Sequence, residues 1–405
     1  MPKYKLHKVL IGGGTNSNTK CSNLGFPDLP SIVNTDRSVT KRIIAIGDIH
    51  GDLDLAINCL TVGGLIKQVY DFDQATCVFL KYKDEQDPRI YKWIAKNTIV
   101  VQVGDQIDRC RPVSNECSVE GETVNDEASD LKIMFFFHDL HLIAINSPGC
   151  AVYSLLGNHE LLNVLGNLRY VSYQGLIEFV SNPKDYTEGK KGETMKINAG
   201  ILGRTDAFAK GSSKLLYKSK ANIANFMACS RVSAIVIDGY LFVHAGVLAK
   251  LIDHTSKMKG VKKTETINSI NEAIKNWLLN LDTIEDKEYI QKLLVGKTLS
   301  PFWPRIFGNL PTELKRSNKL CESHVDPVLD ALDLKGIVVG HTPQLKKGIS
   351  STCSSTVWRI DVASSQAFDK LMQGDLNINK DARVPQVLEI TLGLEKSNDT
   401  FKVIT

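Results

Sequence analysis

Five short apolar runs, each ending in a polar motif, constrain this 405-residue chain more than any other feature. The runs cover residues 42–47, 98–104, 151–157, 240–246 and 336–341. Near-continuous apolar runs of this length predict strands that are buried on both faces. The Asp238-Gly239 pair before the fourth run is a hairpin turn signal, so we expect at least one antiparallel strand pair.

Helical patterns lie between the predicted strands. They cover residues 53–60, 128–144, 160–168 and 267–281. Strands that alternate with helices predict a layered α/β domain with a mixed sheet. No internal repeat is visible.

The motif at the end of each run carries side chains that can bind a metal. In chain order these are Asp48-Ile49-His50-Gly51, Gly104-Asp105-Gln106-Ile107-Asp108-Arg109, Gly157-Asn158-His159-Glu160, Val243-His244-Ala245-Gly246 and Gly340-His341-Thr342-Pro343. Ligands bind at the carboxyl edge of α/β sheets, so we expect the motifs to meet there. A single His after a strand is usually a hydrogen-bonded structural residue, but five such motifs favour a shared site.

The residue types in these motifs favour a pair of divalent metals. Carboxylates, imidazoles and an amide oxygen suit borderline ions such as Mn²⁺, Fe²⁺ or Zn²⁺. Two such ions about 3.5–4 Å apart can bind both a phosphate group and an attacking hydroxide. One carboxylate must then bridge the two ions, and it should come from the middle of the set.

Composition and charge limit the partners and the location that we expect for the chain. The formal net charge of +4 is spread along the sequence, which predicts neither nucleic-acid binding nor membrane binding. The apolar stretch near the N-terminus is shorter than a secretory signal, and no stretch is long enough for a membrane helix. Nine cysteines show no CxxC pair, so we expect reduced thiols and a cytoplasmic location. Cys110 and Cys117 share a loop beside a motif, and we expect ordinary thiols there rather than a redox pair.

The motifs DIHG, GDQIDR, GNHE, VHAG and GHTP together resemble the calcineurin-like metallophosphoesterase superfamily. Within it the phosphoprotein phosphatase branch fits best, in particular the Shewanella-like protein phosphatases. The stretches SPFWPR (300–305), VVGHTPQ (338–344) and WRIDVASSQAFD (358–369) support this narrower resemblance. The resemblance covers about residues 40–392. It implies a layered sandwich of mixed β-sheets flanked by helices, with helical insertions.

The resemblance also divides the chain. Residues 1–40, with clusters of Gly, Asn, Ser and Pro, are expected to be an irregular N-terminal extension. Residues 41–395 would form the catalytic domain, and residues 396–405 a C-terminal tail. The unusually long connections are expected to be insertions around the site, at about 65–97, 110–127, 166–232 and 247–300.

The resemblance implies a role for each motif residue. Asp48 and His50 would bind the first of two divalent metals, and Asp105 would bridge both. The second metal would be bound by Asn158, His244 and His341.

The same resemblance implies the catalytic groups. His159 would be the general acid, held by Asp108, while a metal-bridging hydroxide attacks phosphorus in line. Arg109 and Arg305 would clamp the phosphate oxygens, a task that suits the guanidinium fork. From the residues alone, Arg305 also fits a surface arginine, and Asp108 with Arg109 fits a structural ion pair.

Two positions depart from the patterns of relatives. Pro343 stands where many have a second His, which disfavours phosphodiesterases and nucleases and favours phosphomonoesterases. Cys110 stands where the phosphatase pattern has Gly, which changes the loop that admits substrate.

We therefore expect a protein phosphatase acting on phosphorylated Ser, Thr or Tyr. A nucleotide or dinucleoside polyphosphate hydrolase, acting on a small phosphorylated substrate, shares these motifs. An inactive metal-binding scaffold is a third reading, but it predicts a missing ligand or a missing acid, and none is missing.

Overall fold

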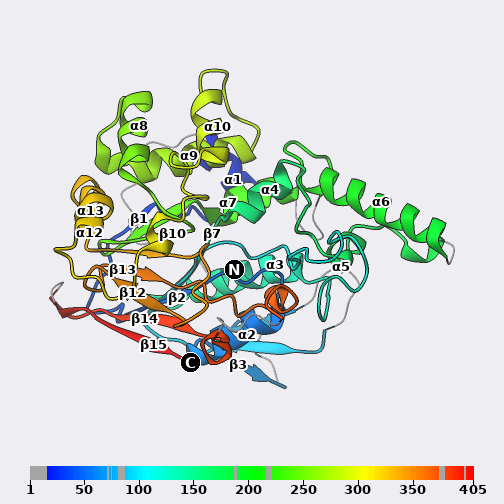
Figure 1. The fold of residues 1–405 in the computed structure, drawn as a ribbon, viewed down its shortest axis with the longest axis horizontal. Coiled ribbons are helices and arrows are strands. Elements are labelled where there is room, and N and C mark those ends of the chain that lie inside the picture. The colour runs from blue at the N-terminus through cyan, green and yellow to red at the C-terminus, as the bar shows by residue number, and fades with distance from the viewer. Residues whose placement is uncertain are drawn as a thin grey trace.

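The structure is a computed structural model that describes residues 16–70, 73, 75–80, 87–186, 189–215, 221–373, 379–395 and 398–405. Two mixed six-stranded sheets lie face to face at its centre (Figure 1). The first contains, in spatial order, β1 (Ile32–Val33), β9 (Ala234–Ile237), β10 (Tyr240–Val243), β11 (Gly336–Val339), β13 (Val357–Arg359) and β12 (Ser350–Thr352). The second contains β15 (Thr400–Ile404), β14 (Val387–Thr391), β2 (Arg42–Ile46), β6 (Thr98–Gln102), β7 (Ala151–Leu155) and β8 (Arg231–Val232).

The strands that precede the motifs run parallel within each sheet. In the second sheet β2 pairs with β6 and β6 pairs with β7 in parallel, and in the first sheet β10, β11 and β13 do the same. Their carboxyl ends therefore meet at one edge, as expected of α/β sheets. β9 and β10 form the predicted antiparallel hairpin, with the turn residues Asp238 and Gly239 at φ 51° and 87°.

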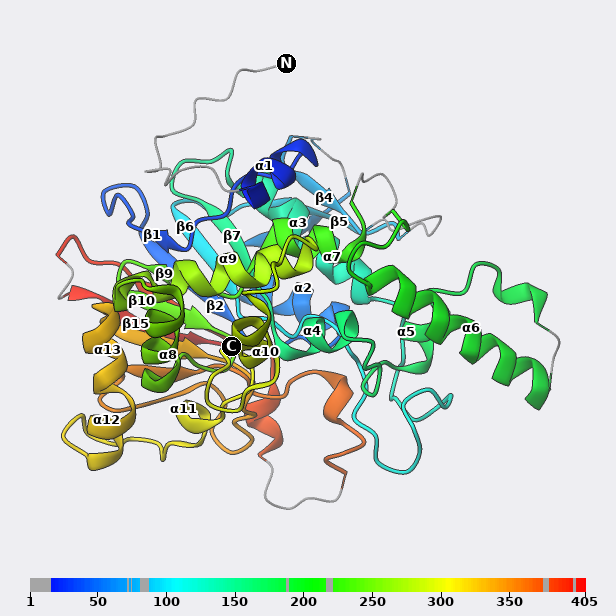
Figure 2. The same cartoon turned by 90° about the horizontal axis from the view of Figure 1, so that it is seen from above.

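Helices cover the outer face of each sheet, which gives a layered α/β sandwich (Figure 1). The helices on the side of the first sheet are α1 (Asn16–Asn23), α7 (Ile223–Ser230), α8 (Ala249–Lys259), α9 (Thr266–Leu278), α10 (Lys287–Val295), α11 (Ile306–Asn309), α12 (Lys319–His324) and α13 (Asp326–Leu332). On the second sheet lie α2 (Leu53–Val62) and α3 (Asp130–Ala144), with a small sheet of β3 (Ile66–Val69), β5 (Ile90–Trp93) and β4 (Cys77–Phe79). The remaining helices are α4 (Asn158–Val164), α5 (Tyr173–Ile177) and α6 (Lys190–Phe208), and α6 extends away from the body in both views (Figure 2).

The hydrophobic core has three layers. The middle layer lies between the sheets, where Ile43 and Val101 of the second sheet face Phe242 and Val338 of the first. The outer layers bury the helices against the sheets, as α3 does through Phe136. Because both faces of the central strands are buried, the runs read as continuously apolar in the sequence.

The described part of the N-terminal segment differs from the expectation of irregular structure, and the predicted C-terminal tail includes a strand. Residues 16–40 include α1 and β1, which pairs in parallel with β9, and the C-terminal residues form β15 on the edge of the second sheet. Cys21 and Phe26 are buried in the core of the first sheet's helices. Two buried side chains are too few to produce a periodic pattern in the sequence. This segment is therefore held in place by tertiary contacts and not by local preference. The expectation for residues 1–15 lies outside the described part.

The expectation of reduced thiols is wrong for six of the nine cysteines. Disulfides join Cys21 to Cys229, Cys110 to Cys117 and Cys321 to Cys353, whereas Cys59, Cys77 and Cys150 are free and buried. Two of the pairs are separated by 208 and 32 residues, so only the fold brings them together. Disulfides are rare in a reducing cytoplasm, and this finding weighs against the predicted location.

Three of the four predicted insertions contain regular structure, whereas residues 110–127 form turns and bends. Residues 65–97 contribute the strands of the small sheet, and residues 247–300 contain α8, α9 and α10. Residues 166–232 contain α5, α6 and α7. In the part of the chain that is described, no helix combines the length and apolar character that crossing a bilayer requires.

Candidate metal centre

The five motifs meet at the shared carboxyl edge of the two sheets, and several of their residues have unusual backbone conformations. His50, Asp105, Asp108 and His341 have φ angles of 49°, 52°, 72° and 63°. The left-handed region is costly for residues with a Cβ, so it persists only where the surrounding structure fixes it. The fold therefore maintains backbone strain in order to direct these four side chains.

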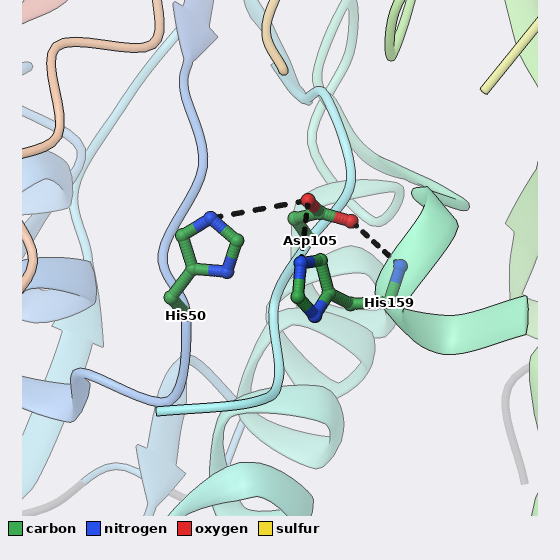
Figure 3. Close-up of side chains that lie close together, drawn as sticks. All are labelled: His50, Asp105 and His159. Carbon is green, nitrogen blue, oxygen red and sulfur yellow. Dashed lines mark hydrogen bonds and ion pairs between the residues drawn. The ribbon is translucent and has the colours of Figure 1, made fainter. Parts of the chain in front are cut away.

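Asp105 lies at the centre of the site. Its Oδ2 is 3.8 Å from Nε2 of His50 and 3.8 Å from Nε2 of His159 (Figure 3). The same oxygen is 3.3 Å from Nε2 of His244. The carboxylate is thus common to two groups of potential ligands, one with His50 and His159 and the other with His244 and His341.

The other predicted ligands complete these groups. Oδ2 of Asp48 is 3.8 Å from Nε2 of His50. On the other side, Nε2 of His244 is 2.9 Å from Oδ1 of Asn158 and 3.2 Å from Nδ1 of His341. The structure therefore brings together all six residues that were predicted as metal ligands, and all six are buried.

Backbone carbonyls orient the rings of the three predicted histidine ligands. A carbonyl only accepts hydrogen bonds, so the ring nitrogen beside it can donate there and leave the other nitrogen for a metal. The contacts are His244 Nδ1 to Val103 O at 3.0 Å, His341 Nε2 to Trp303 O at 3.2 Å and His50 Nδ1 to Ile107 O at 3.4 Å. In each ring the other nitrogen then faces the centre, which is how ligand histidines are held in metal sites.

The electrostatics of the centre favour a cation. Burial raises the pKa of Asp48 well above its usual value, and the carboxylates of Asp361 and Asp105 raise it further. Burial lowers the pKa of His50 and of His341 well below the usual value, so both imidazoles are neutral. A cation would relieve the repulsion between buried carboxylates, and it would bind the neutral form of each ring.

Glycines allow the motifs to approach one another closely. A Cβ on Gly157 would lie 2.1 Å from Oδ1 of Asp105, and a Cβ on Gly340 would lie 2.2 Å from Oδ1 of Asp48. Real side-chain carbons do not make contacts this short. Each glycine thus leaves the space that a predicted metal ligand from another strand occupies.

His159 and Asp108 form the predicted pair. Nδ1 of His159 is 2.8 Å from Oδ2 of Asp108, and Nε2 of His159 faces the centre. The other oxygen of Asp108 accepts hydrogen bonds from Asn163 at 2.9 Å and from Arg204 at 3.3 Å. Asp108 is fully buried, so these contacts fix its carboxylate and, through it, the orientation of the His159 ring.

A cavity of about 610 Å³ opens onto these residues. Three arginines line it, namely Arg111, Arg169 and Arg305, together with Tyr170 and Phe368. A second hollow of about 580 Å³, lined mainly by apolar residues such as Val295 and Ile306, shares Trp303 and Arg305 with it. The cavity therefore combines potential metal ligands with three cations and adjoins an apolar surface.

Arg109 is not placed as expected. Its Nη1 donates to Gly51 O at 2.8 Å and to Glu127 at 2.9 Å, and its Nη2 donates to Asn125 O at 3.1 Å. It does not line the cavity, because its guanidinium turns back to tie the motif after β2 to the loop that precedes α3. The expectation that Arg109 clamps phosphate oxygens is therefore wrong, because its guanidinium does not reach the cavity. Arg305, the other expected clamp residue, does line the cavity.

Arg111 and Asp361 are among the cavity residues that were not predicted as site residues. No sequence motif distinguishes Arg111, because single basic residues are common in loops. Asp361 could have been found, since it follows β13 in the way that the other acidic and imidazole residues follow their strands. Burial raises the pKa of Asp361 to about 6.

Comparisons with known proteins agree on one family. The model of the calcineurin-like phosphoesterases matches residues 41–345. An uncharacterized protein of Acanthamoeba polyphaga mimivirus is 38% identical over 67% of this chain and 98% of its own length. Shewanella-like protein phosphatase 2 of Arabidopsis thaliana is 27% identical over 90% of this chain and 82% of its own length.

Solved structures extend the agreement to the fold. The crystal structure of the cold-active protein-tyrosine phosphatase of a psychrophilic Shewanella species aligns with 93% of this chain and 83% of its own, with a TM-score of 0.51. The two sequences are 17% identical, so this likeness concerns the fold alone.

Proposed function

The chain belongs to the calcineurin-like phosphoesterase family, and from this we infer that it is a metal-dependent phosphatase that hydrolyses phosphate monoesters on proteins. The observation that carries the inference is the position of Asp105. Its carboxylate is shared by two groups of potential ligands, and His159 faces the same centre with Asp108 behind it.

The donor set fits a pair of divalent metal ions. Nε2 of His244 and Nδ1 of His341 lie 3.2 Å apart, and the other nitrogen of each ring faces a backbone carbonyl. A divalent cation could therefore accept a lone pair from each ring. Asp48, His50 and Asp105 would hold one ion, while Asp105, Asn158, His244 and His341 would hold the other.

Divalent ions bound there would polarise the phosphate oxygens and lower the pKa of water at the site. The nitrogen and oxygen donors suit Mn²⁺, Fe²⁺ or Zn²⁺.

His159 is proposed as the general acid. Its Nδ1 is held by Asp108, so Nε2 is the atom that can donate a proton to the leaving oxygen of the substrate. Asp108 fixes the ring in one orientation. A leaving alkoxide or phenoxide needs this proton at neutral pH, so the pair suits monoesters of Ser, Thr or Tyr.

Arg305 is proposed to bind phosphate oxygens at the mouth of the cavity. It is exposed and lines the catalytic cavity as well as the neighbouring apolar hollow. A phosphorylated side chain could enter the cavity while a neighbouring apolar residue of the substrate rests against Trp303 and Ile306. The name of the Arabidopsis relative supports a protein substrate.

The experiment that tests the substrate class compares two substrates on the same metal-loaded protein. We expect kcat/KM for phosphopeptides to exceed that for diadenosine polyphosphates. The reverse preference would contradict the protein phosphatase and favour a dinucleoside polyphosphate hydrolase.

The nucleotide alternative has one observation in its favour. The indole of Trp303 borders both hollows, and an aromatic side chain there could stack on a nucleobase. An inactive scaffold is the remaining alternative. It requires that p-nitrophenyl phosphate stays intact when both metal sites are filled.

A further inference from the structure

Arg111 lies where Arg109 was expected to be. Its Nη2 is 2.8 Å from Nε2 and 2.9 Å from Nδ1 of His50, and 3.5 Å from Nε2 of His159. Its guanidinium therefore lines the cavity beside His50 and His159. The Arg109 guanidinium, by contrast, is occupied by Gly51, Asn125 and Glu127. Of the two arginines in this loop, Arg111 is the one that faces the site.

Contacts on two sides hold Arg111 in this position. Its Nη1 donates to Cys110 O at 2.7 Å and to Asp108 O at 3.2 Å. Its guanidinium carbon lies 4.6 Å from the ring centroid of Phe368 and 5.3 Å from that of Tyr170. Cation–π contacts of this kind orient the charged plane without using its N–H donors. Backbone oxygens occupy Nη1, so Nη2 is the group that faces the cavity beside His50 and His159.

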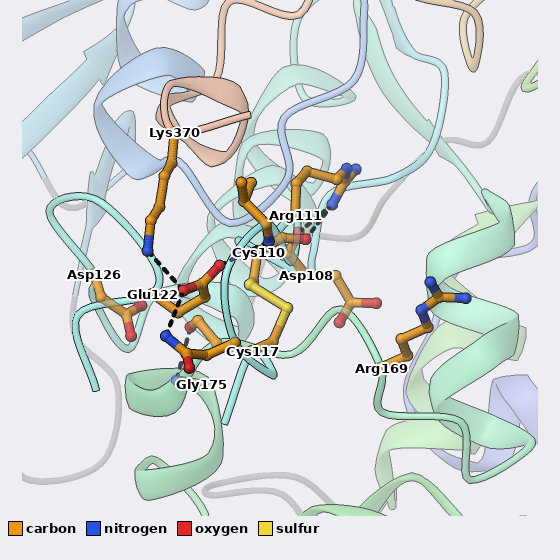
Figure 4. The surroundings of a disulfide bond; sticks show 12 residues. Asp108, Cys110, Arg111, Cys117, Glu122, Asp126, Arg169, Gly175 and Lys370 are labelled. Atoms are coloured by element: carbon orange, nitrogen blue, oxygen red, sulfur yellow. Dashed lines mark hydrogen bonds and ion pairs between the residues drawn. A yellow bond between two sulfur atoms is a disulfide. The ribbon is translucent and has the colours of Figure 1, made fainter. Parts of the chain in front are cut away.

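A disulfide closes the loop that carries this arginine (Figure 4). Cys110, the residue directly before Arg111, is bonded to Cys117, and both are buried. The N–H of Cys110 also donates to Tyr170 O at 3.1 Å. Cys110 thus links the disulfide to Tyr170, one of the two aromatic residues that contact Arg111.

Glu122 ties the loop to the other aromatic partner. Its carboxylate accepts hydrogen bonds from the N–H groups of Val113 at 2.7 Å and Ser114 at 2.9 Å, both within the closed loop. It also accepts from Lys370 Nζ at 2.6 Å, two residues beyond Phe368 (Figure 4). The loop is therefore attached on both sides of the Arg111 guanidinium.

We propose that Arg111 binds the phosphate group of the substrate in the role first expected of Arg109, and that the Cys110–Cys117 disulfide positions it. This assignment rests on the proposed phosphatase function. Without the disulfide the loop would gain conformational freedom, and substrate binding would have to order it again. The change should therefore appear mainly in KM and in phosphate affinity, and less in kcat.

The test measures p-nitrophenyl phosphate kinetics and inhibition by inorganic phosphate on metal-loaded protein. For Arg111→Ala we expect KM and the inhibition constant of phosphate to rise together by about 10- to 100-fold, because a charge-assisted contact to phosphate is lost. Arg111→Lys should recover part of this loss. The double variant Cys110→Ser/Cys117→Ser should shift both constants in the same direction.

The matched control is the double variant Cys321→Ser/Cys353→Ser, which removes a disulfide outside the cavity and should leave both constants unchanged. Reduction of the wild type with dithiothreitol should reproduce the effect of Cys110→Ser/Cys117→Ser and add nothing to that variant. Alkylation of the untreated, denatured protein should label three cysteines of nine, namely Cys59, Cys77 and Cys150.

Additive effects of Arg111→Ala and Cys110→Ser/Cys117→Ser would overturn the positioning role, because the disulfide would then act independently of Arg111. Unchanged phosphate inhibition in Arg111→Ala would overturn the binding role. If the wild type hydrolyses no phosphomonoester, the proposed function fails separately. Calorimetric titration of the same variants with inorganic phosphate would still decide the roles of Arg111 and the disulfide.

Discussion

The imidazole of His159 and the carboxylate of Asp108 lie 2.8 Å apart, with Asp108 fully buried behind the ring. This contact turns Nε2 of His159 towards Asp105 and the candidate metal ligands. Because His159 also lies within reach of a metal bound between His50 and Asp105, its geometry alone fits both an acid and a ligand. The two roles predict different outcomes when the ring is removed.

His159→Asn should leave metal content intact and lower kcat by about 10²- to 10⁴-fold, the range of general acid catalysis. The measurement pairs steady-state kinetics on p-nitrophenyl phosphate with metal analysis of the same preparation. Asp108→Asn should lower kcat in the same direction without loss of metal. Loss of an ion from His159→Asn would instead make His159 a ligand.

Asp105→Asn should disturb both metal sites at once, because Oδ2 of Asp105 is 3.8 Å from His50 Nε2 and 3.3 Å from His244 Nε2. Equilibrium dialysis against Mn²⁺ would measure the stoichiometry and the two affinities. As a comparison, His244→Asn should weaken mainly the site that contains Asn158 and His341. Retention of one site at wild-type affinity in Asp105→Asn would contradict bridging.

The stability of the fold should fall between pH 7 and pH 5. Burial lowers the pKa of His138 to about 3 and that of His141 to about 4, from an ordinary value of 6.5. Below pH 6.5 the unfolded chain therefore binds protons that the folded chain does not, and the free energy of unfolding decreases. Burial raises the pKa of Asp139 to about 6, which has the opposite sign and offsets part of this loss as the pH falls below 6.

The variant His138→Phe isolates one of these contributions. His138 packs against Phe26 and Phe226, with ring centroids 5.2 and 5.3 Å away, so a phenyl ring fits the same surroundings. Urea unfolding at pH 5 and pH 7, without metal, should show the pH-dependent loss reduced by about 1–2 kcal/mol. An identical pH dependence in wild type and variant would show that His138 is protonated equally in both states.

Much of the fold and the metal site could be predicted because the signals are local. Asp238-Gly239 specifies its hairpin in two residues, and each motif directly follows the strand that places it. The two sheets align those strand ends at one edge, so Asp48, Asp105 and His341 meet although they are far apart in the chain. Regularity of this kind can be read without knowing the tertiary structure.

The remaining features depend on tertiary contacts. Arg109 and Arg111 are two residues apart in one loop. Arg109 contacts Glu127, 18 residues further along, whereas Arg111 contacts Phe368 from a distant segment. The pairing of Cys21 with Cys229 likewise spans 208 residues and has no sequence signature. Such assignments follow from packing, which a pattern of residue types does not encode.

Metal titration with a simultaneous activity assay tests whether the chain binds two metal ions and needs both for hydrolysis. Protein freed of metal with a chelator would be titrated with Mn²⁺ while bound metal and p-nitrophenyl phosphate hydrolysis are measured. We expect two ions per chain, with activity that appears as the second ion binds. Saturation at one ion with full activity, or two bound ions without hydrolysis, would contradict this expectation.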